Sequence, residues 1–143
     1  MIPNRSMPDA AVVPELVYRD LGAAIRWLCD AFGFSLRLRI ANHRAQLDAG
    51  AGAVVLVAGE PCDPPPGGRA AGVMVRVEDV DRHCAQSRRS GAEIVRPPAD
   101  YPYGERQYAC RDLGNYVWTF SQTIADVAPE AWGASRPGGE RLI

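Results

Sequence analysis

One pattern occurs twice along the chain, and it constrains the fold more than any other feature. A strand-like segment leads to an aspartate, an apolar helical stripe, a glycine and a further strand-like segment. Asp20 and Gly33 mark the first copy, and Asp79 and Gly91 mark the second. Aspartate is a favoured helix N-cap, and glycine readily adopts the left-handed conformation that ends a helix. The sequence therefore predicts two copies of one strand–helix–strand unit.

Each copy continues into further strands. Residues 34–41, 43–49 and 53–58 follow the first helix, and residues 105–112 and 115–120 are the last two strands of the second copy. In the first of these strands, leucine and isoleucine alternate with Arg37 and Arg39, which predicts a half-buried strand. The inward stripe of the first helix consists of Leu21, Ala24, Ile25, Leu28, Ala31 and Phe32.

We therefore expect an α+β fold of two tandem βαβββ units. Three consecutive prolines in EPCDPPPGGR cannot extend a helix or an interior strand, so they indicate a linker. A short helix is predicted in DVAPEAW. The expected segments are a flexible N-terminus at 1–10, a domain at 11–122 made of units 11–60 and 70–122 with a linker at 60–70, and a short helix and tail at 123–143.

Charge and composition exclude several classes of function. A net charge of -1 and a pI near 6.1 give no long-range attraction for phosphates, so we expect no nucleic-acid partner. No run approaches the ~20 apolar residues that span a bilayer, and residues 1–10 lack the apolar centre of a secretion signal. A cytoplasmic protein without a membrane partner is expected. The four cysteines form no C-x-x-C pair, so neither a zinc site nor a disulfide framework is indicated.

The order of the motifs resembles the vicinal oxygen chelate superfamily, which includes glyoxalases, extradiol dioxygenases and bleomycin-resistance proteins. AFGF follows the first helix, VEDVD opens the second, and RDLGN forms a turn before the last strand. The resemblance implies a curved, cup-like mixed sheet with the helices outside. In the metalloenzymes of this superfamily, each unit supplies a His or Gln from its first strand and a Glu from its last.

The metal-ligand positions that the resemblance implies are Val13, Gly72, Val55 or Val57, and Trp118. None of these side chains ligates a divalent ion, because metals need imidazole, carboxylate or thiolate donors. We therefore expect no metal and no other cofactor.

An aromatic face is predicted in the last strand. The period of two places Tyr116, Trp118 and Phe120 together, and the position of Trp118 leaves core packing and ligand contact equally open. Tyr101 and Tyr103 lie in a Pro-rich loop that is expected to close over a ligand. The expected ligand-binding residues are Trp118, Tyr116, Tyr101, Tyr103, Gln107, Met74, Arg76 and Glu15.

A metal-free, aromatic cup resembles the resistance-protein branch. The leading expectation is a homodimer that sequesters a planar aromatic natural product, because flat rings stack favourably on Tyr and Trp. One alternative is a cofactor-free lyase, isomerase or epimerase that uses Glu15 with Arg76 or Tyr108. The other is a structural dimerisation module. For Glu15 itself, a salt bridge is the simpler interpretation.

Overall fold

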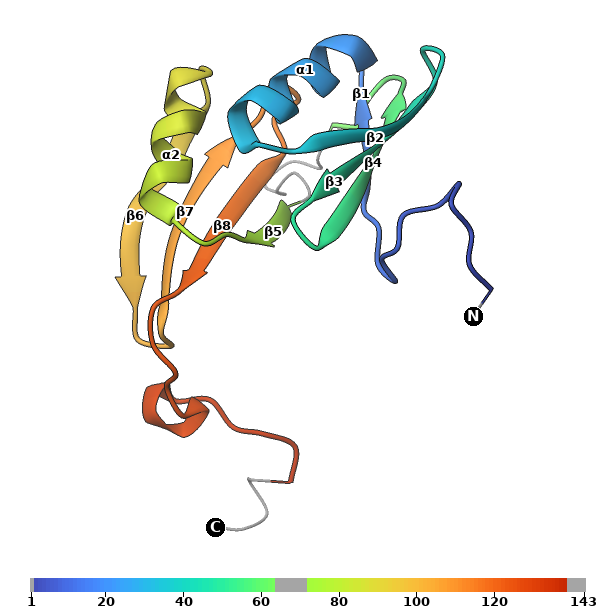
Figure 1. Cartoon of the computed structure of the whole chain (residues 1–143). Coiled ribbons are helices and arrows are strands. Elements are labelled where there is room, and N and C mark those ends of the chain that lie inside the picture. The colour runs from blue at the N-terminus through green and yellow to red at the C-terminus, as the bar shows by residue number, and fades with distance from the viewer. Residues whose placement is uncertain (1, 64–71, 139–143) are drawn as a thin grey trace.

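The computed structural model describes residues 2–63 and 72–138, and these form two repeated βαβββ units (Figure 1). The first unit contains β1 (Glu15–Tyr18), α1 (Leu21–Phe32), β2 (Ser35–Ile40), β3 (Arg44–Ala49) and β4 (Gly52–Ala58). The second contains β5 (Gly72–Arg76), α2 (Val80–Arg89), β6 (Glu93–Tyr101), β7 (Glu105–Arg111) and β8 (Val117–Thr123). The predicted α+β class and the two tandem modules are confirmed.

The strands form two mixed sheets of four strands each, in the orders β1-β4-β3-β2 and β5-β8-β7-β6. In each sheet the first strand of the unit pairs in parallel with the last strand, and the remaining pairs are antiparallel. The two units therefore have the same topology, as the repeat in the sequence predicted.

Both helices begin at the predicted capping residues, and α1 also ends at its predicted glycine. The Asp20 side chain accepts a hydrogen bond from the amide of Ala23, and Asp79 does the same for Arg82. Gly33 has a φ of 74°, and its amide donates to the Cys29 carbonyl at the end of α1. The last residue of α2 is Arg89, and its C-cap is Ser90 instead of the predicted Gly91. The six predicted stripe residues of α1 are all buried.

The two units share one hydrophobic core on the helix side of the sheets. Figure 1 shows α1 and α2 on the same side of the two sheets. The helices also contact each other, because Trp27 Nε1 donates to the carbonyl of Ser90 and Gln86 Nε2 donates to that of Asp30. No helix of the described residues lies on the opposite faces of the sheets, which we call the cup faces.

The predicted alternation of β2 is interrupted. A register shift lies between Leu36 and Leu38. Leu36 pairs with Leu47 on the helix side. After the shift, Leu38 pairs with Gln46 and Ile40 pairs with Arg44, both on the cup face. The bulge moves the later residues of the strand to the opposite face, so Leu36, Leu38 and Ile40 do not share one face. They remain 37–58% exposed, and the prediction of a half-buried strand with one apolar face is wrong.

Two further segments bear on the predictions. Most of the expected linker at 60–70 lies outside the described residues. After β8, Pro129–Trp132 form a 3-10 helix within the segment where the sequence predicted a short helix. Within residues 2–63 and 72–138, no helix is long and apolar enough to span a membrane.

Candidate functional site

The cup face of the second sheet brings together three of the predicted binding residues. Arg76 on β5 pairs with Ser121 on β8, which in turn pairs with Gln107 on β7. Met74 lies one row away on β5, opposite Thr119. Because neighbouring strands align these positions on one face, Met74, Arg76 and Gln107 all project to the side without helices.

A hydrogen-bonded network lies at the centre of this face. Gln107 Nε2 donates to Ser121 Oγ at 3.0 Å, and that hydroxyl donates to Glu105 Oε1 at 2.6 Å. Hydrogen bonds from Ser121 and Thr123 lower the pKa of Glu105, and the nearby positive charge of Arg76 adds to this effect. The sequence prediction missed Glu105 and Ser121, although both share the parity of Gln107 and Arg76.

The predicted tyrosines extend this network to the end of the sheet. Tyr101 and Tyr103 stack with ring centroids 5.5 Å apart, and Tyr103 Oη donates to Gln107 Oε1 at 3.2 Å. Trp132 of the 3-10 helix packs on Tyr103 with a centroid distance of 5.2 Å. Arg96 donates to the Tyr101 hydroxyl at 3.3 Å. An aromatic stack thus adjoins a hydrogen-bonding centre.

A groove lies beside Met74 and Arg76, between β5 and the turn that joins β3 to β4. Its volume is about 420 Å³. The side chains around it are mostly small and apolar, including Val12, Pro14 and Ala53. Met74 is 66% exposed there, so its flexible thioether is available for contact.

Trp118 and Tyr116 do not line the cup, and their predicted placement there is wrong. Trp118 is fully buried on the helix side of β8, where its ring packs against Phe32 and Phe34. The Tyr116 hydroxyl contacts the backbone of Val17, and its ring packs edge-on against Tyr18. The large aromatic rings of β8 lie on its buried helix side, whereas Thr119 and Ser121 lie on its cup face.

Trp118 is held in the core by Asp112. The Asp112 carboxylate is 5% exposed and accepts from Trp118 Nε1 at 2.9 Å and from the Tyr18 hydroxyl at 2.5 Å. The amides of Gly114 and Tyr116 also donate to it. Burial raises the pKa of Asp112, and these four donors act in the opposite direction.

Glu15 lies on the cup face of the first sheet, where it forms an ion pair with Arg44 at 2.5 Å. The simpler interpretation of Glu15 as a salt-bridge residue agrees with this contact. Tyr108, offered in the enzyme alternative as its partner, is fully buried on the helix side, so that pairing is wrong. Burial raises the pKa of Tyr108.

The residues present on the cup faces do not fit a divalent-metal site. On the first and last strands of the first unit, the paired cup-facing positions are Glu15 with Val55 and Val17 with Val57. On those of the second unit they are Gly72 with Val117, Met74 with Thr119 and Arg76 with Ser121. Only Glu15 carries a carboxylate, and Arg44 engages it. Among the described residues, no three His, Cys, Asp or Glu side chains gather closely enough to hold a metal ion.

Residues 10–120 match the model of the glyoxalase/bleomycin resistance protein/dioxygenase superfamily. The chain belongs to this superfamily. TioX from Micromonospora sp. ML1 is 41% identical, with a TM-score of 0.67 over 78% of this chain and 97% of TioX. The bleomycin resistance determinant of transposon Tn5 has the same fold at 19% identity, with a TM-score of 0.64 over 80% of this chain and 98% of that protein.

A shorter similarity extends to a mycobacterial protein. An uncharacterized protein of Mycolicibacterium smegmatis is 33% identical over 92 residues, which are 64% of this chain and 77% of that protein. The superfamily includes enzymes as well as resistance proteins, so membership by itself assigns no reaction.

Proposed function

We propose that this superfamily member binds a planar aromatic natural product in its cup without changing it, in antibiotic resistance or carriage. The observation that carries the proposal is the second cup face, where the stacked Tyr101 and Tyr103 adjoin the hydrogen-bonding side chain of Gln107. Stacked rings offer a flat surface to a planar molecule, and the exposed Arg76 side chain would recognise its polar edge. The similarity to TioX and to the Tn5 determinant supports this assignment.

The proposal includes a homodimer. Leu38, Ile40 and Met74 project from the cup faces and are 37%, 58% and 66% exposed. Exposed apolar side chains gathered on one side of a small protein are typical of a surface that a partner covers. A second copy that packs on these faces would enclose the ligand between two chains.

The electrostatics support binding more than proton abstraction. A general base works best when its pKa lies near the working pH. The hydrogen bonds on Glu105 move its pKa in the wrong direction, and Glu15 is engaged by Arg44. A cofactor-free lyase, isomerase or epimerase would need a freer base than either carboxylate.

Fluorescence titration with a panel of planar aromatic antibiotics tests this function. Trp132 packs on Tyr103 and should report binding through quenching. Tyr103→Ala should weaken binding by about 2 kcal/mol or more, as aromatic anchors do. Tyr116→Phe is the matched control, because Tyr116 bonds to Val17 away from the cup. Equal affinity of Tyr103→Ala and the wild type, or conversion of the bound compound seen by mass spectrometry, would contradict the proposal.

The metal-free part of the proposal has its own measurement. Elemental analysis of the purified, dialysed protein should find no stoichiometric zinc, nickel, iron or manganese, because no three His, Cys, Asp or Glu side chains of the described residues gather closely enough to hold an ion. One retained equivalent of metal would instead favour a metalloenzyme.

A further inference from the structure

The segment from Asn4 to Pro8, which we call the strap, lies against the cup face of the first sheet. Gln46 Nε2 on β3 donates to the Ser6 carbonyl at 3.0 Å, and Arg37 Nη2 on β2 donates to the Arg5 carbonyl at 2.7 Å. Figure 1 shows the N-terminal segment below the first sheet, with α1 above. The strap and α1 therefore lie on opposite sides of this sheet.

Burial on this face agrees with the hydrogen bonds. Gln46 is 8% exposed and Val55, its partner in register, is 3% exposed, although no helix covers them. Pro8 is buried as well, whereas its neighbours in the strap are exposed. The strap thus bonds to the sheet through two backbone carbonyls, and its one buried residue is Pro8.

The strap is also organised internally. The Ser6 amide donates to Asn4 Oδ1 at 3.0 Å, and the Met7 amide donates to the Asn4 carbonyl at 3.2 Å. On the sheet, Arg37 Nη1 donates to Gln46 Oε1 at 2.5 Å, which fixes the amide group so that its Nε2 faces the strap. Donors and acceptors are therefore matched on both sides of the contact.

We propose that the strap is a displaceable cover, and that a bound aromatic molecule competes with it for Arg37, Gln46 and the apolar surface around Val55. This inference rests on the proposed function of the cup. A guanidinium and an amide that hold backbone carbonyls offer the same donors to a carbonyl or phenolic oxygen of a ligand. Few contacts hold the strap, and such segments open more easily than a packed core. The strap thus covers the part of the first cup face around Gln46 at rest.

Limited proteolysis tests whether these contacts hold the strap. The chain contains no lysine, so trypsin cuts only after arginine, and the Arg5–Ser6 bond lies within the strap. Arg37→Ala should increase the rate of cleavage at this bond by about five-fold or more, measured by mass spectrometry. Arg39→Ala is the control, because Arg39 donates to Ala41 and Asn42 instead. Equal rates of cleavage in wild type and Arg37→Ala would overturn the proposal.

Binding of a flat fluorescent probe, anilinonaphthalene sulfonate, tests the competition. Pro8→Asp should expel the strap without changing the cup and lower the Kd of the probe by about five-fold or more. Pro3→Asp places the same charge at an exposed position and should leave the Kd unchanged. Equal affinity of Pro8→Asp and Pro3→Asp would overturn the inference.

Tyr103→Ala separates this result from the proposed function. If Pro8→Asp strengthens probe binding but Tyr103→Ala leaves it unchanged, the strap is supported and the aromatic site on the second sheet is wrong. If Tyr103→Ala weakens binding and Pro8→Asp has no effect, the aromatic site stands and the strap is no cover.

Discussion

The Asp112 carboxylate links the two units through single hydrogen bonds in the core. Its donors include Tyr18 from β1 of the first unit and Trp118 from β8 of the second. A buried donor without an acceptor costs about 1–3 kcal/mol, so one substitution at Asp112 affects several groups at once. The turn chemistry of RDLGN is visible in the sequence, but its role in joining the units is not.

Asp112→Ala should lower the free energy of unfolding by more than about 3 kcal/mol, because it leaves the buried Tyr18 and Trp118 donors unsatisfied. Urea denaturation followed by circular dichroism measures the change. Tyr18→Phe removes only one donor and should cost about 1 kcal/mol. Equal costs for the two variants would show that Asp112 is not the centre of this network.

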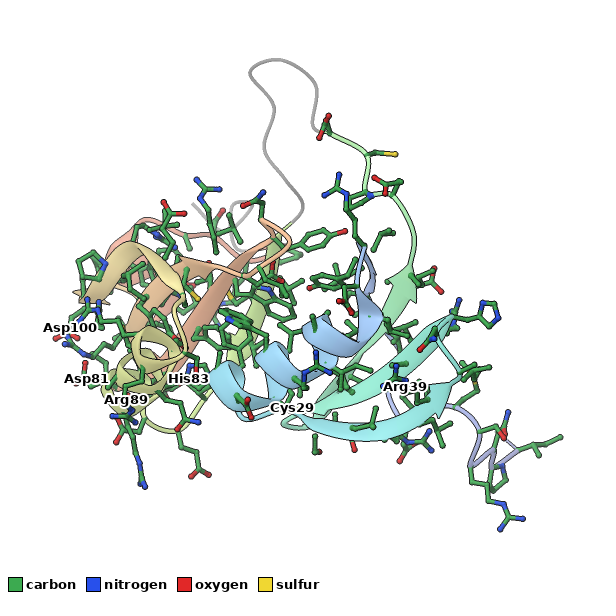
Figure 2. All side chains as sticks on the ribbon, turned by 90° about the horizontal axis from the view of Figure 1, so that it is seen from above. Cys29, Arg39, Asp81, His83, Arg89 and Asp100 are labelled. Carbon is green, nitrogen blue, oxygen red and sulfur yellow. The ribbon has the colours of Figure 1, made fainter. Side chains whose placement is uncertain are left out.

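His83 couples stability to pH. Figure 2 shows His83 between α2 and the end of α1. Its Nε2 donates to the Phe32 carbonyl at 3.0 Å, and its Nδ1 lies 2.5 Å from the Tyr108 hydroxyl. Desolvation lowers the pKa of His83, which favours a neutral ring whose Nδ1 accepts from the Tyr108 hydroxyl.

The free energy of unfolding should therefore fall as the pH drops below about 6.5, the usual pKa of an unfolded histidine. The sign follows because the unfolded state takes up the proton first, and the contribution is complete above that pH. His83→Gln should flatten the dependence between pH 7 and 5, measured by urea denaturation. His43→Gln, at an exposed position, should retain it. If the free energy of unfolding of His83→Gln depends on pH as strongly as that of the wild type, other groups cause the effect.

At the scale of elements, the helices were predictable and the faces of the strands only in part. The period of α1 identified its six buried residues, because a helix has one apolar stripe. A strand has two faces, and the period of two does not say which one meets the helices. In β8 the polar alternation of Thr119 and Ser121 is the signal that identifies the cup face.

Other parts of the site depended on contacts between distant segments. Met74, Arg76 and Gln107, which we expect to bind the ligand, share one face because strand parity extends across a sheet. The strap and the packing of Trp132 on Tyr103 join residues far apart in the sequence, and no local pattern encodes them. The bulge in β2 was also missed, since a single extra residue leaves the apparent alternation intact.

Gly104 fixes the segment that carries Trp132 onto the β6–β7 hairpin. Its φ is 80°, and an added Cβ would lie 2.2 Å from the Ala125 carbonyl oxygen. The Gly104 carbonyl also accepts from the amides of Ile124 and Ala125. Gly104→Ala should therefore displace this segment and separate Trp132 from Tyr103.

Thermal unfolding and tryptophan fluorescence measure the consequence of Gly104→Ala. Gly91→Ala is the matched control, because its φ is 89° but an added Cβ meets nothing within 4 Å. A left-handed alanine costs about 1–2 kcal/mol in either position. Gly104→Ala should cost at least about 1 kcal/mol more than Gly91→Ala and shift the emission of Trp132. Similar stabilities of the two variants would show that the segment around Ala125 shifts to accommodate the added methyl group at no cost in stability.

For the whole molecule, one core joins both units and leaves both cup faces without helices. The core includes residues from α1 and from β7 and β8 of the second unit. The two units should therefore unfold together, and in the proposed dimer a second copy covers apolar side chains that remain outside this core. Leu38, Ile40 and Met74 are the side chains on the cup faces that this copy would cover.

Light scattering at micromolar concentration should give twice the 15.5 kDa mass of one chain. Ile40→Asp places a charge on the exposed cup face and should shift the protein towards the monomer, because an unpaired charge is costly to bury at an interface. Leu113→Asp is the control, since Leu113 is 44% exposed but lies in the turn between β7 and β8. If the wild type is a monomer, or if Ile40→Asp and Leu113→Asp dissociate to the same extent, the cup faces are not the dimer interface. The aromatic site would then have to bind its ligand within one chain.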